Sequence, residues 1–217
     1  TSVGTLSASI EKTVAVGSPE VPIDSLQARW FFAEESGPAL DSSGNGRNAE
    51  LVDGPTRDVG PGGLPAMRFN GVSTAAEFSA PLPTKTTVAG WMHMDTKGNS
   101  VFPRMVHSPT YYLFPGRDHS VTPKAPDANR GTLKFLAHWS EVDGVYCSEP
   151  DLVVDGRWYH MAATYDGTRG RFEPPRLFLD GKQLGVTAQA GATGVFAPTE
   201  GSGYLGNSDT KTRALDG

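Results

Sequence analysis

Short apolar runs separated by turn residues recur along the chain from residue 28 to residue 217. Each run has the length of a strand, and glycine, proline, aspartate or asparagine interrupts the pattern about every 8–12 residues. The 26 glycines and 17 prolines favour turns over long helices. No window clearly follows the apolar period of an amphipathic helix. The pattern therefore predicts an all-β fold, a two-sheet antiparallel β-sandwich.

The most informative run is GRWYHMAATYDG, residues 156–167. Alternate side chains of a strand share a face, which puts Trp158, His160, Ala162 and Thr164 on one side and Tyr159, Met161, Ala163 and Tyr165 on the other. Both faces carry apolar bulk, so we expect a central strand. Farther on, Asp180-Gly181 separates RLFL from KQLG. It predicts a two-residue hairpin turn, because glycine accepts the positive φ that such a turn needs.

Three segments go beyond a generic strand pattern. They are ARWFFAEESGPALDSSGNGRNAEL at 28–51, AMRFNGVSTAAEF with TVAGWMHMD at 66–95, and DGRWYHMAATYDG with RLFLDGKQLG and YLGNS at 155–208. In this order and spacing they resemble the laminin-G-like, concanavalin A-like jelly-roll domains of bacterial surface and secreted proteins. The resemblance covers residues 28–217 and implies an extracellular or cell-envelope location. Residues 1–27 are then a linker or the tail of a preceding domain. The family usually has one more strand after a glycine such as Gly217, so we expect the C-terminal strand to be missing.

The polar stretch DSSGNGRN, residues 41–48, raises the question of a metal. Asp41, Ser43 and Asn45 supply oxygens at alternate positions, as in the first half of an EF-hand loop. The second half does not fit, because Val52 occupies the position that needs a bidentate glutamate. An EF-hand is therefore excluded.

The resemblance implies a different metal site at the same turn. Family members often hold one structural calcium ion (Ca2+) here, which makes Asp41, Asn45 and Asn48 the expected ligands and Asp53 a further candidate. A single carboxylate is few for calcium, which takes about six to eight oxygens. The alternative is a hydrogen-bonded turn in which Asp and Asn side chains bind their own backbone.

The sequence offers no convincing catalytic set. A retaining glycosidase needs two carboxylates about 5–5.5 Å apart, and the nearest match is Glu141 and Asp143 in EVDGVY, where Val145 stands in place of a further acid. No G-x-S-x-G nucleophile turn occurs, and the five histidines have no paired metal spacing. The one cysteine, Cys147, excludes an internal disulfide and is expected to be a small buried apolar residue.

Aromatic residues are the best candidates for ligand contacts. Jelly-roll sheets hold sugars by stacking rings against the apolar face of a pyranose, and rings with a polar group suit this role. The candidates are Tyr111, Tyr112, Trp139 and Tyr146, which lie in the segments expected to form the rim of such a sheet. The alternative for each of them is a place in the core. Alternation in GTLKFLAHW places Trp139 on the face of Leu133 and Phe135, which favours the core, and leaves His138 on the other face.

Charge and hydropathy exclude two classes of partner. A net charge of −5 argues against nucleic acid, which normally needs a basic face. No stretch approaches the roughly 20 apolar residues of a membrane span, so we expect no membrane insertion. We therefore predict a non-catalytic binding or adhesion module for glycan or extracellular protein ligands, part of a larger parent chain. The alternatives are a glycoside hydrolase or polysaccharide lyase on the same fold, and an architectural spacer without a ligand.

Overall fold

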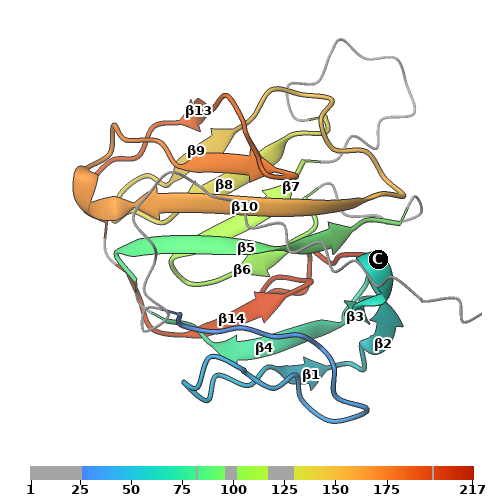
Figure 1. Ribbon diagram of the computed structural model, residues 1–217. Helices are drawn as coiled ribbons and strands as arrows, with labels where there is room; N and C mark the ends of the chain where they lie inside the picture. Colours follow the sequence, from blue (N-terminus) through green and yellow to red (C-terminus); the bar gives the residue numbers. More distant parts are fainter. Residues whose placement is uncertain (1–25, 82, 96–101, 117–129, 197) are drawn as a thin grey trace, which may run out of the picture.

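The computed structural model describes residues 26–81, 83–95, 102–116, 130–196 and 198–217. Residues 1–25, most of the predicted linker or tail, lie outside the described part of the chain. The described residues form two facing antiparallel sheets and a small third sheet (Figure 1). The predicted all-β fold, a two-sheet antiparallel β-sandwich, is therefore confirmed.

The larger sheet has eight strands. In spatial order they are β1 (Glu50–Val52), β4 (Ala75–Ser79), β14 (Ser202–Leu205), β6 (Val106–His107), β7 (Tyr111–Pro115), β8 (Leu133–Ala137), β9 (Gly144–Cys147) and β13 (Thr187–Ala190). The smaller sheet has the order β12 (Lys182–Gln183), β11 (Arg176–Leu179), β10 (Trp158–Asp166) and β5 (Lys85–His93). The third sheet pairs β2 (Thr56–Val59) with β3 (Pro65–Arg68). Two short 3-10 helices, η2 (Pro61–Gly63) and η3 (Gly167–Arg169), occupy turns.

Strand β10 is central, as its two apolar faces predict. It pairs with β5 along all nine of its residues and with β11 on its other side. Its inward residues are buried and its outward residues half-buried, in strict alternation. The predicted hairpin turn is also confirmed, with positive φ at Asp180 (49°) and Gly181 (79°) between β11 and β12.

The core lies between the two large sheets. Its fully buried side chains include Leu113, Leu133 and Phe135 from the eight-stranded sheet and Met161 and Leu177 from the four-stranded sheet. Burial of such side chains from both layers is the main force that holds the sheets together.

Residues 28–34 do not form a strand, although their run of apolar residues has the length of one. Trp30 forms a single bridge with Asp41, and Phe32 has a φ of 58°, which interrupts an extended backbone. Trp30 instead anchors the segment, because its Nε1–H donates to the Arg47 carbonyl at 2.8 Å and its ring packs on Phe78 at 4.6 Å.

The last residues of the chain pair with the end of β3. Gly71 N–H donates to the Leu215 carbonyl at 2.9 Å, and Asn70 bridges to Asp216. On the other side, Asp95 N–H donates to the Asp216 carbonyl at 2.6 Å. These bonds hold the segment between the ends of β3 and β5. The further strand expected after Gly217 stays a prediction.

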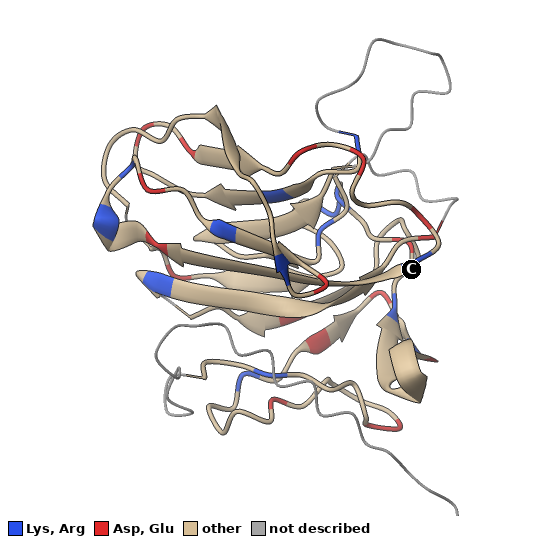
Figure 2. Cartoon of the chain, turned by 45° about the horizontal axis from the view of Figure 1, so that its top comes forward, with Lys and Arg blue, Asp and Glu red and all other residues tan. Residues whose placement is uncertain are grey.

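Charged residues of both signs occur on strands and loops of the described chain (Figure 2). In the part of the chain that the structure describes, no helix is both long and apolar enough to cross a bilayer. Cys147 is buried on β9, and burial raises the pKa of its thiol. The expectation of a buried, apolar role for this residue is confirmed.

Candidate functional site

The outer face of the eight-stranded sheet, the face turned away from the four-stranded sheet, carries an unusual row of polar and aromatic side chains. Antiparallel partners in register share a face. The pairings of β1, β4, β14, β6, β7 and β8 therefore align the following residues: Glu50, Glu77, Tyr204, His107, Tyr112 and Leu136. We call this set the outer row. Its members come from segments far apart in the sequence.

Tyr112 lies near the centre of the outer row and is half-buried. The His107 ring stacks on it, with centroids 3.9 Å apart and planes at 19°, and the His138 ring meets it edge-on at 4.7 Å. The Arg104 guanidinium carbon lies 4.8 Å from the centre of the Tyr112 ring. Burial raises the pKa of Tyr112 to about 12 although the Arg104 charge lowers it. The phenol is therefore protonated at neutral pH and can donate a hydrogen bond.

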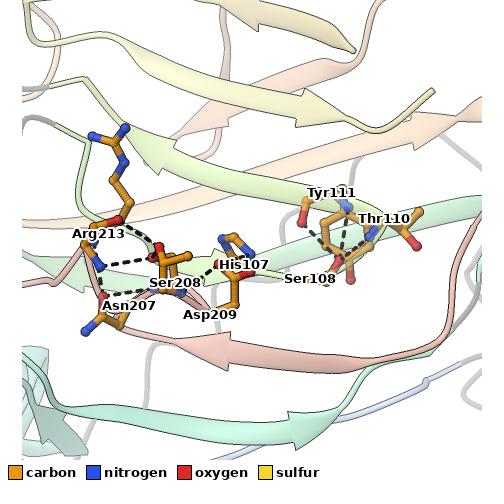
Figure 3. Close-up of polar contacts among 10 residues, drawn as sticks. His107, Ser108, Thr110, Tyr111, Asn207, Ser208, Asp209 and Arg213 are labelled. Carbon is orange, nitrogen blue, oxygen red and sulfur yellow. Dashed lines mark hydrogen bonds and ion pairs between the residues drawn. The ribbon is translucent and has the colours of Figure 1, made fainter. Parts of the chain in front are cut away.

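His107 is buried beside Asp209, as Figure 3 shows. Its Nε2 lies 3.4 Å from Asp209 Oδ1. Burial lowers the pKa of His107 to about 4, against the opposing effect of the Asp209 charge. The imidazole is therefore neutral at pH 7, and the 3.4 Å contact with Asp209 is not an ion pair. His107 Nδ1 is buried and has no hydrogen-bond partner among the described residues.

The loop after β14 positions Asp209. Asn207 Oδ1 accepts hydrogen bonds from Ser208 N–H at 2.9 Å and Arg213 N–H at 3.2 Å, which closes the loop (Figure 3). The Arg213 carbonyl in turn accepts from Arg104 N–H at 3.0 Å. The loop is therefore fixed against the strand segment that leads into β6.

A groove of about 830 Å³ lies at the β1 end of the outer row. Its lining includes Arg47, Glu50, Glu77, Glu200 and Ser202. Glu50 and Glu77 are direct cross-strand partners on β1 and β4. This pairing was not predictable from the sequence, because it depends on the register of two strands joined by a long connection.

The four predicted ligand aromatics separate into two groups. Tyr111 and Tyr146 are only 6% and 3% exposed, so they take the alternative for each of these rings, a place in the core, and do not form a rim. Both point into the core, where the Tyr111 ring stacks on Phe135 at 6.0 Å. Trp139 packs against the core, as alternation predicts, and its Nε1–H donates to Tyr165 Oη at 3.1 Å. Among the four, Tyr112 lies on the outer face.

The DSSGNGRN segment forms a hydrogen-bonded turn. Asp41 Oδ1 accepts from the N–H groups of Arg29 (2.9 Å) and Ser43 (2.8 Å). Its Oδ2 accepts from Ser43 Oγ–H (2.7 Å) and from Arg47 N–H (3.0 Å). Burial raises the pKa of Asp41, but these four hydrogen bonds outweigh burial and lower it to about 2. Asp41 is thus the centre of the turn.

The other expected calcium ligands are also engaged. Asn48 Oδ1 accepts from Asp41 N–H at 2.9 Å, Asn45 Nδ2–H donates to the Leu26 carbonyl at 2.7 Å, and Asp53 pairs with Lys211 Nζ at 2.7 Å. Within the described ranges no group of three or more His, Cys, Asp or Glu could hold a metal. This arrangement does not fit a calcium ion, because hydrogen-bond donors already occupy the carboxylate. Calcium at the turn remains an untested prediction.

Glu141 and Asp143 do not form a catalytic pair. Asp143 Oδ2 lies 3.1 Å from His138 Nδ1, and its Oδ1 accepts from Trp139 N–H at 3.2 Å. Glu141 is exposed in the turn before β9. Asp143 therefore orients His138 and stabilises the turn.

A comparison with known families matches residues 68–217 to the model of the concanavalin A-like lectin/glucanases superfamily. A search of curated proteins found no match. The family match spans more than half of the chain and includes most strands of both large sheets. On this match and on the sandwich described above, the chain belongs to the concanavalin A-like lectin/glucanases superfamily.

Proposed function

We propose that this domain is a non-catalytic binding module that recognises a carbohydrate on the outer face of the eight-stranded sheet. The observation that carries the proposal is the cluster around Tyr112, in which an aromatic ring, two imidazoles and a guanidinium meet on an outer sheet face. Outer faces of sandwiches are normally simply solvated. A ligand site gives this concentration of polar aromatic groups a physical reason.

The chemistry of the cluster suits a sugar. A pyranose has an apolar face for a ring such as Tyr112 or Tyr204, and hydroxyl groups for nearby donors and acceptors. The half-buried Tyr112 has a protonated phenol that offers a donor. The superfamily description, which includes lectins, supports the same substrate class.

A glycoside hydrolase is the second candidate, favoured by the cross-strand pair Glu50 and Glu77. A glycosidase acid must be sheltered from water so that its pKa rises toward neutrality. Glu50 is exposed, and its strand β1 has three residues and lies at the edge of the sheet. The pair therefore lacks the shelter that a general acid needs, and we favour binding without catalysis.

The same proposal includes an extracellular or cell-envelope location and membership of a larger parent protein. A protein ligand on the same face and a ligand-free spacer are the competing possibilities. Both of them predict that no glycan binds.

A glycan array with purified protein tests the proposal. We expect specific glycans to bind, and Tyr112→Ala to weaken binding about fivefold or more, because truncating an aromatic anchor costs about 1 kcal/mol or more. Trp91→Ala is the matched control, since Trp91 is 50% exposed on the outer side of the four-stranded sheet. Loss of binding in the Trp91 variant alone would move the site to the other sheet. Absence of any bound glycan would favour a spacer or a protein ligand.

Catalysis is tested on the glycans that bind. We expect neither new reducing ends, the product of a hydrolase, nor unsaturated uronides, the product of a lyase. Release of reducing ends by the wild type but not by Glu77→Gln would establish the hydrolase instead.

A further inference from the structure

Arg104 is a buried cation without a matching carboxylate. It is 7% exposed, and its Nε–H has no hydrogen-bond partner in the described part of the chain. Its Nη1 donates weakly to the Phe102 carbonyl at 3.3 Å. Among the described residues, no carboxylate lies within ion-pair distance of Arg104. Such a charge is costly to bury unless something compensates it.

Aromatic rings supply part of the compensation. The guanidinium carbon lies 3.9 Å from the centre of the Phe114 ring and 4.8 Å from that of Tyr112. The negative ring faces attract a cation, but they leave hydrogen-bond donors such as Nε–H unsatisfied. Burial lowers the pKa of Arg104 to about 10, which leaves the group charged at neutral pH.

A second arginine makes the local charge more positive. Arg213 faces the same segment, because its carbonyl accepts the Arg104 N–H at 3.0 Å, and its charge further lowers the pKa of Arg104. Its guanidinium carbon lies 5.6 Å from the centre of the Phe102 ring, and Lys134 Nζ lies 5.0 Å from the same ring. The nearby acidic group, Asp209, is 61% exposed and contacts His107. Like charges gathered in this way repel each other unless an anion lies between them.

We propose that Arg104 and Arg213 bind an anionic group, a carboxylate or sulfate carried by an acidic glycan, on the outer face of the eight-stranded sheet. The inference rests on the proposed function and names the class of glycan. A guanidinium presents two parallel N–H donors that match either group. Tyr112 and His107 lie beside Arg104 and would contact the sugar that carries the charge. The net charge of −5 gives no long-range attraction, so the site acts at short range.

Binding of paired charged and neutral glycans tests the inference. One pair is oligogalacturonate and its methyl ester, and the other is sulfated and unsulfated dextran. Isothermal titration calorimetry should show about tenfold or tighter binding of the charged member in at least one pair, and the pair that responds distinguishes carboxylate from sulfate. Equal binding of charged and neutral members would overturn the inference and leave the proposed carbohydrate function intact.

Variants assign the effect to the two arginines. Arg213→Gln should remove most of the preference for the charged glycan, and Arg104→Lys should weaken it because lysine keeps the charge but loses the paired donors. Arg176→Gln is the control, since Arg176 is exposed on β11 of the other sheet. A preference that survives in Arg213→Gln would refute the assignment. Melting curves check that each variant folds.

If no glycan binds, the proposed function is wrong, and a separate measurement is needed to test the anion site. Inorganic sulfate, compared with chloride at equal ionic strength, should then raise the melting temperature of the wild type and of Arg176→Gln more than that of Arg213→Gln. An equal rise in all three proteins would overturn the anion site as well.

Discussion

Replacing Asp41 by asparagine is expected to destabilise the domain in a pH-dependent manner. The four hydrogen bonds to the Asp41 carboxylate keep its pKa at about 2, below the ordinary value of 3.8. That difference corresponds to about 2 kcal/mol of stability at neutral pH, and to about 1–2 kcal/mol once solvent screening of this half-buried group is considered. Asparagine cannot accept all four bonds, because its Nδ2 is a donor that would face the donors at Oδ2.

Urea denaturation of the wild type and Asp41→Asn across pH measures the effect. The contribution is fully present above pH 3.8, since the folded-state pKa lies below that of the unfolded chain, and it is lost as pH falls toward 2. The two proteins should therefore differ by about 1–2 kcal/mol at pH 7 and converge in acid. Asp53→Asn is the control, because the Asp53 carboxylate is solvent-exposed. Among the charged groups of the described residues, it pairs only with Lys211.

Calcium and chelator separate the two explanations of the turn. If the hydrogen bonds stabilise it, the difference between the wild type and Asp41→Asn is the same in excess calcium and in excess chelator. A difference that appears only with calcium would refute the hydrogen-bond reasoning and establish the metal site expected from the family resemblance.

Three further perturbations test other parts of the structure. His107 has a pKa of about 4 in the folded chain, below its ordinary 6.5, so its contribution to stability is full above pH 6.5 and is lost as pH falls toward 4. In urea denaturation the wild type should therefore lose about 2 kcal/mol more stability than His107→Gln between pH 7.5 and pH 5. Equal losses would place the imidazole in solvent. Gly206→Ala should cost about 2–4 kcal/mol, because Gly206 has a φ of 78° and a Cβ there would meet the Phe69 ring; an unchanged melting temperature would contradict this packing. Cys147 should react with a thiol reagent only on unfolding, because burial raises the pKa of its thiol; fast labelling of the native protein would show that β9 is open.

Local patterns in the sequence predicted the central strand and its hairpin because the physical causes are local. Alternation in the segment from Trp158 to Asp166 follows directly from strand geometry, and Asp180-Gly181 is a turn by its own backbone preferences. The break at Phe32 was not predictable, because a positive φ at phenylalanine depends on the packing around it. Local residue chemistry thus accounts for the scaffold but not for its irregular N-terminal segment.

The candidate site was less predictable because it depends on long-range register. Alternation separates Tyr111 from Tyr112, but it does not say which of them faces the core. Tyr204 meets His107, and Arg213 meets Arg104, only because β14 and the following loop lie beside β6. The buried, unsatisfied Arg104 could not be recognised without these contacts.

The central claim is that the outer face of the eight-stranded sheet binds the ligand. Titration of isotope-labelled protein with a bound glycan, followed by amide chemical shifts, tests it most directly. We expect the largest amide shifts in β6, β7 and β14, around His107, Tyr112 and Tyr204, and almost no change in the amide shifts of β5 and β10. Shifts concentrated around Trp91 and Trp158, on the outer side of the four-stranded sheet, would contradict the claim.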